Sequence, residues 1–407
     1  MMLHFPEGFR WGSATAAHQI EGNNLNTDWW AREHAPGTTI AEPSGDACDS
    51  YHRYREDMEV LADVGLGTYR FSLEWARIEP EKGFVSRAEL DHYRRMVETA
   101  RELGIEPMVT LHHFTIPRWF DAEGGWLALD AVDRFTRFTE AVLPVLDGVE
   151  LVCTINEPNM VAMFAGDDPA HAEPTTLQAF GQPAPNPRVA DTLLAAHQSA
   201  REVLAAAGPF RSGWTVATQD FQPEPGCEEL ARAYGYPRDA WFLEAARGDD
   251  WVGVQAYTRT KIGPGGPLPV PADAEKTLTG WEFYPRALED GVRLAHAMVP
   301  GVPVLVTENG IATADDTRRI AYTRGALTGL HAAIADGIQV EGYLYWSLLD
   351  NYEWGSYGPT FGLVAVDRET FARTVKPSAR WLGDVARANA VEADPTAADP
   401  TSAEADA

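Results

Sequence analysis

Eight short apolar runs divide almost the whole chain of 407 residues and begin roughly 47 residues apart on average. A run such as 302–309 is hydrophobic without alternation, which is typical of strands buried on both faces of a parallel sheet. Between the runs lie stretches with the length and periodicity of amphipathic helices. The predicted strands are 9–16, 68–74, 107–113, 151–157, 211–218, 251–258, 302–309 and 340–347, and the predicted helices are 50–64, 88–103, 131–146, 189–207, 284–298 and 316–335.

Strand and helix alternate without a break in composition, which predicts one α/β domain, a single (β/α)8 TIM barrel over residues 1–390. A doubly wound dinucleotide-binding fold should show G-x-G-x-x-G after its first strand, and 10–15 lacks it. The Pro- and Gly-rich segments 165–187 and 263–271 are predicted to be loops at the barrel entrance. An acidic, Ala- and Pro-rich tail at 391–407 is predicted to be disordered.

Charge and cysteine usage exclude several classes of function. The formal net charge is -27, so neither a nucleic acid nor an anionic membrane is an expected partner. Cys48, Cys153 and Cys227 have no C-x-x-C spacing, which predicts neither a disulfide framework nor a thiolate metal site. No run reaches the ~18 apolar residues of a membrane span, and the N-terminus has no signal-peptide pattern, so we expect a cytoplasmic protein.

Polar residues end many of the apolar runs, at the position where a barrel carries its catalytic groups. Two of them, Glu157 and Glu308, end the fourth and seventh strands. A pair of facing carboxyl groups suits glycoside hydrolysis, since one can donate a proton while the other attacks the anomeric carbon or activates water. Each Glu alone could equally cap a helix or pair with an Arg. The full set of polar strand ends is Glu74, His113, Asn156, Glu157, Tyr257, Glu308, Asn309 and Trp346.

Six motifs occur in a specific order along the chain: W-G-S-A-T at 11–15, Q-I-E-G at 19–22, Y-R-F-S at 69–72, N-E-P at 156–158, T-E-N-G at 307–310 and W-S-L-L-D-N-Y-E-W at 346–354. Together they resemble glycoside hydrolase family 1, which contains β-glucosidases and β-galactosidases. The resemblance covers about residues 5–385.

The resemblance implies a retaining β-glycosidase that works through a covalent glycosyl-enzyme. Glu157 would be the general acid and base, and Glu308 the nucleophile. Arg70 would hold Glu308 ionised, and Tyr257 would donate a hydrogen bond to the same carboxylate. Asn156 would bind the 2-hydroxyl of the sugar. No metal ion or organic cofactor is expected, because the two carboxyl groups supply both the proton transfer and the nucleophile.

The resemblance also implies how the sugar is bound. Gln19, His113 and Glu353 would bind its hydroxyl groups, with Trp354 beside Glu353. Trp346 would form the apolar floor under the ring, although a lone Trp is more often core packing. The acidic Glu353 favours an unphosphorylated glucoside, galactoside or fucoside, carried on an aryl, alkyl or glycosyl aglycone.

Three residues near the expected sugar site depart from the family pattern. Phe114 replaces a common Trp and lacks its indole N–H donor, Gln255 replaces the usual Asn, and Ala256 replaces the usual Tyr. The segment 165–187 also differs from the Gly-rich segment usual there. Sugar preference, natural aglycone and oligomeric state stay open.

Other functions compete with hydrolysis. A transglycosidase would use the same covalent intermediate and pass the sugar to an alcohol. A catalytically silent barrel that binds glycosides should lack one carboxylate, yet both are present. A scaffold barrel would leave Arg70, Asn156, Tyr257 and Glu353 unexplained.

Overall fold

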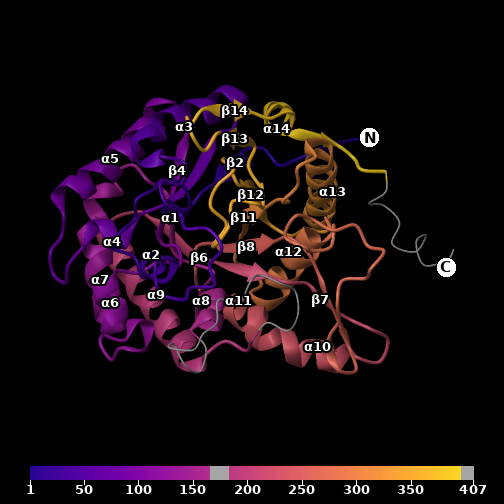
Figure 1. Ribbon diagram of the computed structural model, residues 1–407. Helices are drawn as coiled ribbons and strands as arrows, with labels where there is room; N and C mark the ends of the chain where they lie inside the picture. Colours follow the sequence, from indigo (N-terminus) through magenta and orange to yellow (C-terminus); the bar gives the residue numbers. More distant parts are fainter. Residues whose placement is uncertain (166–182, 396–407) are drawn as a thin grey trace.

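Eight parallel strands close into one barrel in the computed structural model, which describes residues 1–165 and 183–395 (Figure 1). Each strand pairs with the next along the chain, and the last returns to the first. The predicted (β/α)8 barrel is confirmed. Its strands are β2 (Arg10–Ala14), β3 (Thr68–Ser72), β4 (Glu106–His112), β5 (Leu151–Asn156), β6 (Arg211–Thr218), β8 (Val252–Ala256), β11 (Val304–Asn309) and β12 (Val340–Trp346).

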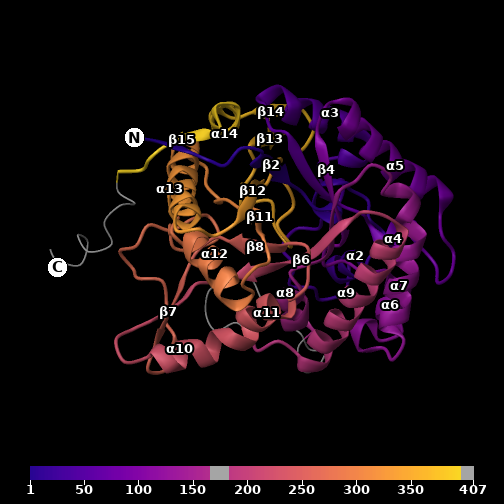
Figure 2. The ribbon, with the colours of Figure 1, turned by 180° about the vertical axis from the view of Figure 1, so that it is seen from behind.

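Long helices surround the barrel on its outside (Figures 1 and 2). They are α3 (Ser50–Val64), α5 (Arg87–Glu102), α7 (Ala131–Val142), α9 (Pro187–Ala207), α12 (Ala287–Met298), α13 (Asp316–Ala335) and α14 (Pro377–Ala388). Shorter helices lie in the connections: α1 (Ala17–Ile20), α2 (Asp28–Glu33), α4 (Trp75–Ile78), α6 (Arg118–Ala122), η1 (Gly125–Leu127), η2 (Leu143–Val145), α8 (Pro158–Phe164), α10 (Glu228–Gly235), η3 (Tyr236–Ala240) and α11 (Trp241–Ala245).

The start of α5 shows how local sequence sets a helix end. Ser86 is the N-cap and accepts the backbone N–H of Glu89 at 3.4 Å, as the S-x-x-E spacing predicts. The reciprocal bond of a capping box is missing, because the backbone N–H of Ser86 donates to Ile78. The Glu89 carboxylate instead accepts the hydroxyl of Tyr51 on α3, which ties the two helices together.

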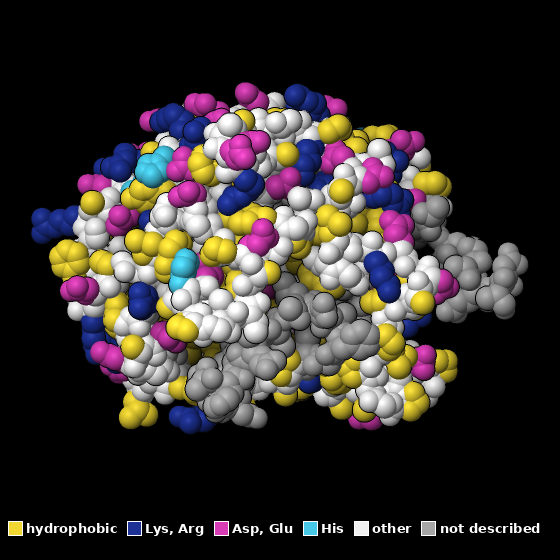
Figure 3. Space-filling view, viewed as in Figure 1, with side chains coloured by type: hydrophobic (Ala, Val, Ile, Leu, Met, Phe, Trp, Pro, Cys, Tyr) yellow, Lys and Arg dark blue, Asp and Glu magenta, His cyan; other side chains and the backbone are white. Residues whose placement is uncertain are grey.

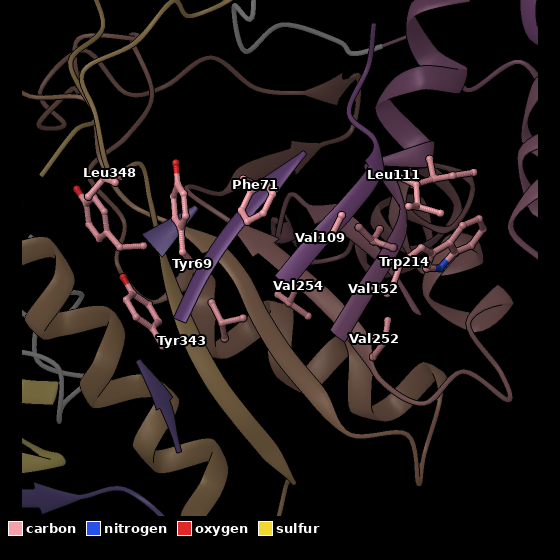
Figure 4. Packing of buried hydrophobic residues seen from close by; sticks show 14 of the residues in the cluster. Tyr69, Phe71, Val109, Leu111, Val152, Trp214, Val252, Val254, Tyr343 and Leu348 are labelled. Carbon is pink, nitrogen blue, oxygen red and sulfur yellow. The ribbon is translucent and has the colours of Figure 1, made fainter. Parts of the chain in front are cut away.

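The barrel strands separate two apolar regions, because successive side chains of a strand point to opposite faces. Figure 4 shows the larger region, in which Tyr69 and Phe71 of β3 and Val109 of β4 belong to the main buried cluster. A second buried cluster combines residues from opposite sides of the barrel and fills its interior: Met108, Leu151, Cys153, Trp251, Leu305 and Leu344. The barrel is therefore a packed core, as is usual for this fold.

Charged residues close the N-terminal end of the barrel. Arg10 contacts Glu106 at 2.9 Å, Glu150 at 3.2 Å and Glu341 at 3.4 Å. Arg211 contacts Glu341 at 2.8 Å and Glu150 at 3.4 Å. These five side chains lie at or beside the first residues of five strands, so the ionic network joins β2, β4, β5, β6 and β12 at the end opposite Glu157 and Glu308.

Small sheets lie outside the barrel. β1 (Met2–His4) pairs with β15 (Ala390–Glu392), so the ordered chain extends beyond residue 390, where the barrel was predicted to end. The part of the predicted tail at 396–407 lies outside the described residues, as does most of the predicted loop 165–187. The predicted loop 263–271 contributes to a sheet of β7 (Phe221–Pro223), β9 (Thr260–Gly263) and β10 (Gly266–Pro267), and β13 (Val364–Val366) pairs with β14 (Arg373–Val375).

The expected absence of nucleic-acid, membrane and metal binding can be compared with the surface charges, the helices and the clustered side chains. Figure 3 shows Lys and Arg side chains interspersed with Asp and Glu over one face, without a continuous basic patch there. Within 1–165 and 183–395, no helix has the length and apolar character needed to cross a membrane. The same ranges contain no group of three or more His, Cys, Asp or Glu residues able to hold a metal ion.

Candidate active site

Extra residues in two barrel strands turn polar side chains toward the barrel interior. In β5, the register moves from Cys153 opposite Gly213 to Asn156 opposite Thr215, which leaves one residue of β5 unmatched. In β11, the register shifts in the same way just before Glu308. Strict alternation would turn Asn156 and Glu308 away from the interior. Such bulges re-aim side chains, and here both reach the same Arg70.

Glu308 is held by two donors. Nη1 of Arg70 donates to Oε1 at 2.7 Å, and the hydroxyl of Tyr257 donates to Oε2 at 2.6 Å. Arg70 is fully buried and is fixed in turn by Thr110 at 3.0 Å and by Oδ1 of Asn156 at 2.5 Å. Burial raises the pKa of Glu308, whereas the Arg70 charge and both hydrogen bonds lower it. These donors therefore stabilise the ionised carboxylate.

Glu157 has a different environment. It follows β5 directly, adopts a left-handed conformation with φ of 45°, and occupies the N-cap position of α8. No ion pair links it to another described residue, and it is 9% exposed. Burial and the nearby charge of Glu308 raise the pKa of Glu157 well above its usual value, although Arg70 opposes them. Glu157 thus keeps its proton at a pH where Glu308 has lost its own.

Three of the predicted sugar-binding residues meet at one point. Nε2 of Gln19 donates to Oε2 of Glu353 at 3.3 Å, and the indole N–H of Trp346 donates to Oε1 at 3.3 Å. The buried Oε1 of Gln19 has no hydrogen-bond partner in the described part of the chain. Desolvation raises the pKa of Glu353 well above its usual value. The cluster therefore has an open acceptor for a hydroxyl group.

The other predicted sugar-binding residues pack beside this cluster. The His113 ring lies nearly parallel to those of Trp346 and Trp354, with centroids 5.9 and 6.2 Å away. Phe114 meets Trp354 edge-on at 5.0 Å. Burial, together with the charge of Arg70, lowers the pKa of His113 well below its usual value, so its ring is neutral. These contacts join the predicted site residues into one network, except Glu157, which follows Asn156 in the chain.

Comparison with known sequences decides the family. The profile described as glycosyl hydrolase family 1 matches residues 1–204 and 258–391. The chain belongs to glycosyl hydrolase family 1. It is therefore a glycosyl hydrolase, as the sequence motifs predicted. The profile does not match 205–257, a stretch that contains β6 and β8 and ends just after Gln255 and Ala256.

Family 1 relatives cover nearly the whole length of this enzyme. The β-glucosidase A of Acetivibrio thermocellus is 32% identical over 95% of this chain and 99% of its own. A bifunctional β-D-glucosidase/β-D-fucosidase of Bifidobacterium breve is 30% identical over 94% of this chain and 98% of its own. The crystal structure of a β-glycosidase matches with a TM-score of 0.88 at 47% identity, covering 96% of this chain and 99% of the other. The family 1 β-glucosidase of Thermotoga maritima matches with a TM-score of 0.87 at 30% identity, over 96% of this chain and 99% of its own. These similarities place the family 1 enzyme among β-glycosidases.

Some contacts were not expected from the sequence. Thr110, which fixes Arg70, had no assigned role, although a buried Thr between apolar residues of β4 is a weak signal of one. Gln255 departs from the family pattern, yet its amide nitrogen donates to Oδ1 of Asn156 at 3.0 Å. Among the polar strand ends, Glu74 caps α4, and Asn309 binds Ala256 and Tyr343. These two residues have structural contacts rather than a place in the carboxylate site.

Proposed function

We propose that this family 1 enzyme hydrolyses terminal β-linked glycosides with net retention of configuration. The observation that supports this best is the asymmetry of the two buried carboxyl groups. Glu308 accepts hydrogen bonds from Arg70 and Tyr257, whereas Glu157 has no cationic partner in the described ranges and a raised pKa. One group is thus prepared as a nucleophile and the other as an acid.

In the first step, the Glu308 carboxylate attacks the anomeric carbon from the α face. The glycosidic C–O bond breaks as Glu157 gives its proton to the leaving oxygen, and an α-linked glycosyl ester of Glu308 forms. Asn156 contacts Arg70 and lies next to Glu157, so its amide can bind the 2-hydroxyl beside the reacting carbon. Such a bond strengthens as positive charge develops in the transition state.

In the second step, Glu157 is a carboxylate and acts as a base. It takes a proton from water while the water oxygen attacks the anomeric carbon from the β face. The ester bond to Glu308 breaks, the sugar leaves with its β configuration, and both carboxyl groups regain their starting protonation states. Arg70 and Tyr257 again stabilise the released Glu308 carboxylate.

The substrate is proposed to be an unphosphorylated glucoside, galactoside or fucoside. The relatives named above include β-glucosidases and a β-D-glucosidase/β-D-fucosidase. Gln19, Glu353 and His113 supply donors and acceptors for hydroxyl groups, and Trp346 supplies an aromatic surface beside them. Glu353 supplies no positive charge to pair with a phosphate on the sugar, which supports an unphosphorylated ligand.

Azide rescue of two variants tests the roles of the carboxyl groups. Glu308→Ala and Glu157→Ala are assayed with 2,4-dinitrophenyl β-glucoside, and each should lose about 100-fold or more of its turnover. Added azide should restore turnover in both. Glu308→Ala should give the inverted α-glycosyl azide, and Glu157→Ala the retained β-glycosyl azide.

Glu74→Gln is the matched control, because Glu74 is also a buried acid following a barrel strand but caps α4. Azide should not change its rate or products. If both alanine variants gave the same azide anomer, the assignment of roles would be wrong. Full activity of Glu308→Ala would also rule it out.

A further inference from the structure

Gln255 lies in the barrel interior beside the proposed nucleophile. It belongs to β8, where its Cα pairs in register with Glu308 of β11 on one side and with Ala217 of β6 on the other. Its neighbours Val254 and Ala256 belong to the apolar cluster outside the strands. The side chain of Gln255 therefore points inward, where it is fully buried and reaches Asn156 across β6.

The donors and acceptors here can be assigned from Arg70. A guanidinium group has only donors, so the Asn156 atom 2.5 Å from Nη2 of Arg70 must be its carbonyl oxygen. The Gln255 atom 3.0 Å from that same oxygen must then be its amide nitrogen. This leaves Oε1 of Gln255 as a buried acceptor without a partner among the described residues.

The same assignment determines which hydrogen-bonding group of Asn156 stays available for a ligand. Its NH2 group carries two hydrogens, and among the described residues it contacts Nε2 of His113 at 3.4 Å. At least one N–H therefore stays available. Asn156 and Gln255 together present one open donor and one open acceptor, which is the pair that a hydroxyl group can satisfy, because it accepts and donates at once.

We propose that Gln255 is a positioning and specificity-determining residue for the sugar 2-hydroxyl. Its N–H holds the Asn156 amide so that the NH2 group faces the sugar, and its Oε1 accepts the hydrogen of the same hydroxyl. This inference rests on the proposed function, in which Asn156 binds that hydroxyl. A buried acceptor left unpaired is costly, so a substrate with a 2-hydroxyl gains more here than a 2-deoxy substrate.

The test compares two substrates that differ only in that hydroxyl. Wild type and Gln255→Met are assayed with 2,4-dinitrophenyl β-glucoside and with its 2-deoxy analogue. Gln255→Met keeps the length of the side chain and removes both hydrogen-bonding atoms. We expect kcat/KM for the glucoside to fall about 10- to 100-fold, and for the 2-deoxy substrate less than about threefold.

Two further variants separate this role from packing. Thr154→Val is the matched control, because Thr154 is a buried polar residue of β5 that bonds His197 of α9 instead of the site. Thr154→Val should change kcat/KM by the same factor for both substrates. Gln255→Asn keeps an amide on a side chain that is one methylene shorter. Its kcat/KM should again fall more for the glucoside than for the 2-deoxy substrate. This variant gives the same comparison if Gln255→Met does not fold.

The outcomes distinguish this inference from the proposed function. Equal losses on both substrates, from an otherwise active enzyme, would overturn the role of Gln255 and leave the proposed function intact. A wild type that hydrolyses neither substrate would overturn the proposed function, and the inference with it.

Discussion

Arg70 organises the proposed site more than any other side chain. Its three nitrogens donate to Thr110, Asn156 and Glu308, so one rigid guanidinium sets the position of the nucleophile and the orientation of the Asn156 amide. Its charge also lowers the pKa of His113, which keeps that ring neutral. A single buried cation thus affects the ionisation of Glu308, the charge of His113 and the orientation of the Asn156 amide.

Tyr257 should tune the ionisation of Glu308. Tyr257→Phe removes the 2.6 Å bond to Oε2 of Glu308, which favours the charged carboxylate. The pKa of Glu308 should therefore rise, and the acidic limb of the kcat/KM profile should move to higher pH. We also expect kcat/KM at the optimum to fall about 10- to 100-fold, as for a lost bond to a charged group. The measurement is the pH dependence of kcat/KM with an aryl β-glucoside.

Tyr51→Phe provides the matched comparison. The hydroxyl of Tyr51 also donates to a carboxylate, that of Glu89, but it does so between α3 and α5. Its pH profile should overlay that of the wild type. An unchanged acidic limb in Tyr257→Phe would show that Tyr257 does not stabilise the ionised form of the group that sets this limb.

Secondary-structure elements show what could be predicted from the sequence. The mainly apolar runs predicted all eight barrel strands, because a strand buried on both faces is apolar over most of its length. The side on which Asn156 and Glu308 lie could not be predicted, since one extra residue in β5 and in β11 breaks the period of two. The contact of Gln255 with Asn156 joins β8 to β5 across an intervening strand, which sequence spacing does not reveal.

The ionic network at the strand starts should contribute to stability and not to turnover. Glu341 accepts bonds from Arg10 and Arg211 and is largely shielded from solvent. Glu341→Ala leaves both cations with fewer partners and should lower the free energy of unfolding by about 1–3 kcal/mol. Because the network lies at the end of the barrel opposite Glu308, kcat of the folded enzyme should not change. Urea unfolding measures the free energy of unfolding, and steady-state kinetics of the same preparation measure kcat.

Glu98→Ala is the control for that change. Glu98 pairs with Arg94 on the exposed face of α5, where both side chains are more than 40% exposed. Such a pair contributes about 0–1 kcal/mol. If Glu341→Ala were no more destabilising than Glu98→Ala, the network would not hold the strand starts together. A large loss of kcat in Glu341→Ala would mean that the two ends of the barrel are coupled.

At the scale of the whole molecule, acidic groups dominate both the surface and the interior. The chain has 60 Asp and Glu residues against 33 Lys and Arg, a net charge of -27. Some of these acids are buried without full compensation, and burial raises the pKa of Glu21, Asp220 and Asp239 to about 7. Repulsion across the surface and deprotonation in the interior should both act against the folded state as the pH rises.

Stability should therefore fall on the alkaline side, as the pH rises from about 6 to 8. A carboxyl group whose pKa is raised in the folded state binds more protons there than in the unfolded chain, so its contribution is lost as pH rises through about 7. Below about pH 6.5, the buried histidines have the opposite effect on stability. Burial lowers the pKa of His92 to about 4 and of His112 to about 3, so the stability that these neutral rings contribute is lost as the pH drops below about 6.5.

Urea unfolding at fixed ionic strength between pH 5 and 8.5 measures this dependence. Glu21, Asp220 and Asp239 together should lower the free energy of unfolding by about 2 kcal/mol between pH 6.5 and 8.5. Asp239→Asn removes one of the three titrating groups, so its alkaline slope should be shallower by about a third. Added salt screens surface repulsion far more than buried titration, so the slope that remains in 0.5 M NaCl isolates the buried acids. A free energy of unfolding that rises steadily to pH 8.5 would mean that these acids are already ionised in the folded protein at neutral pH.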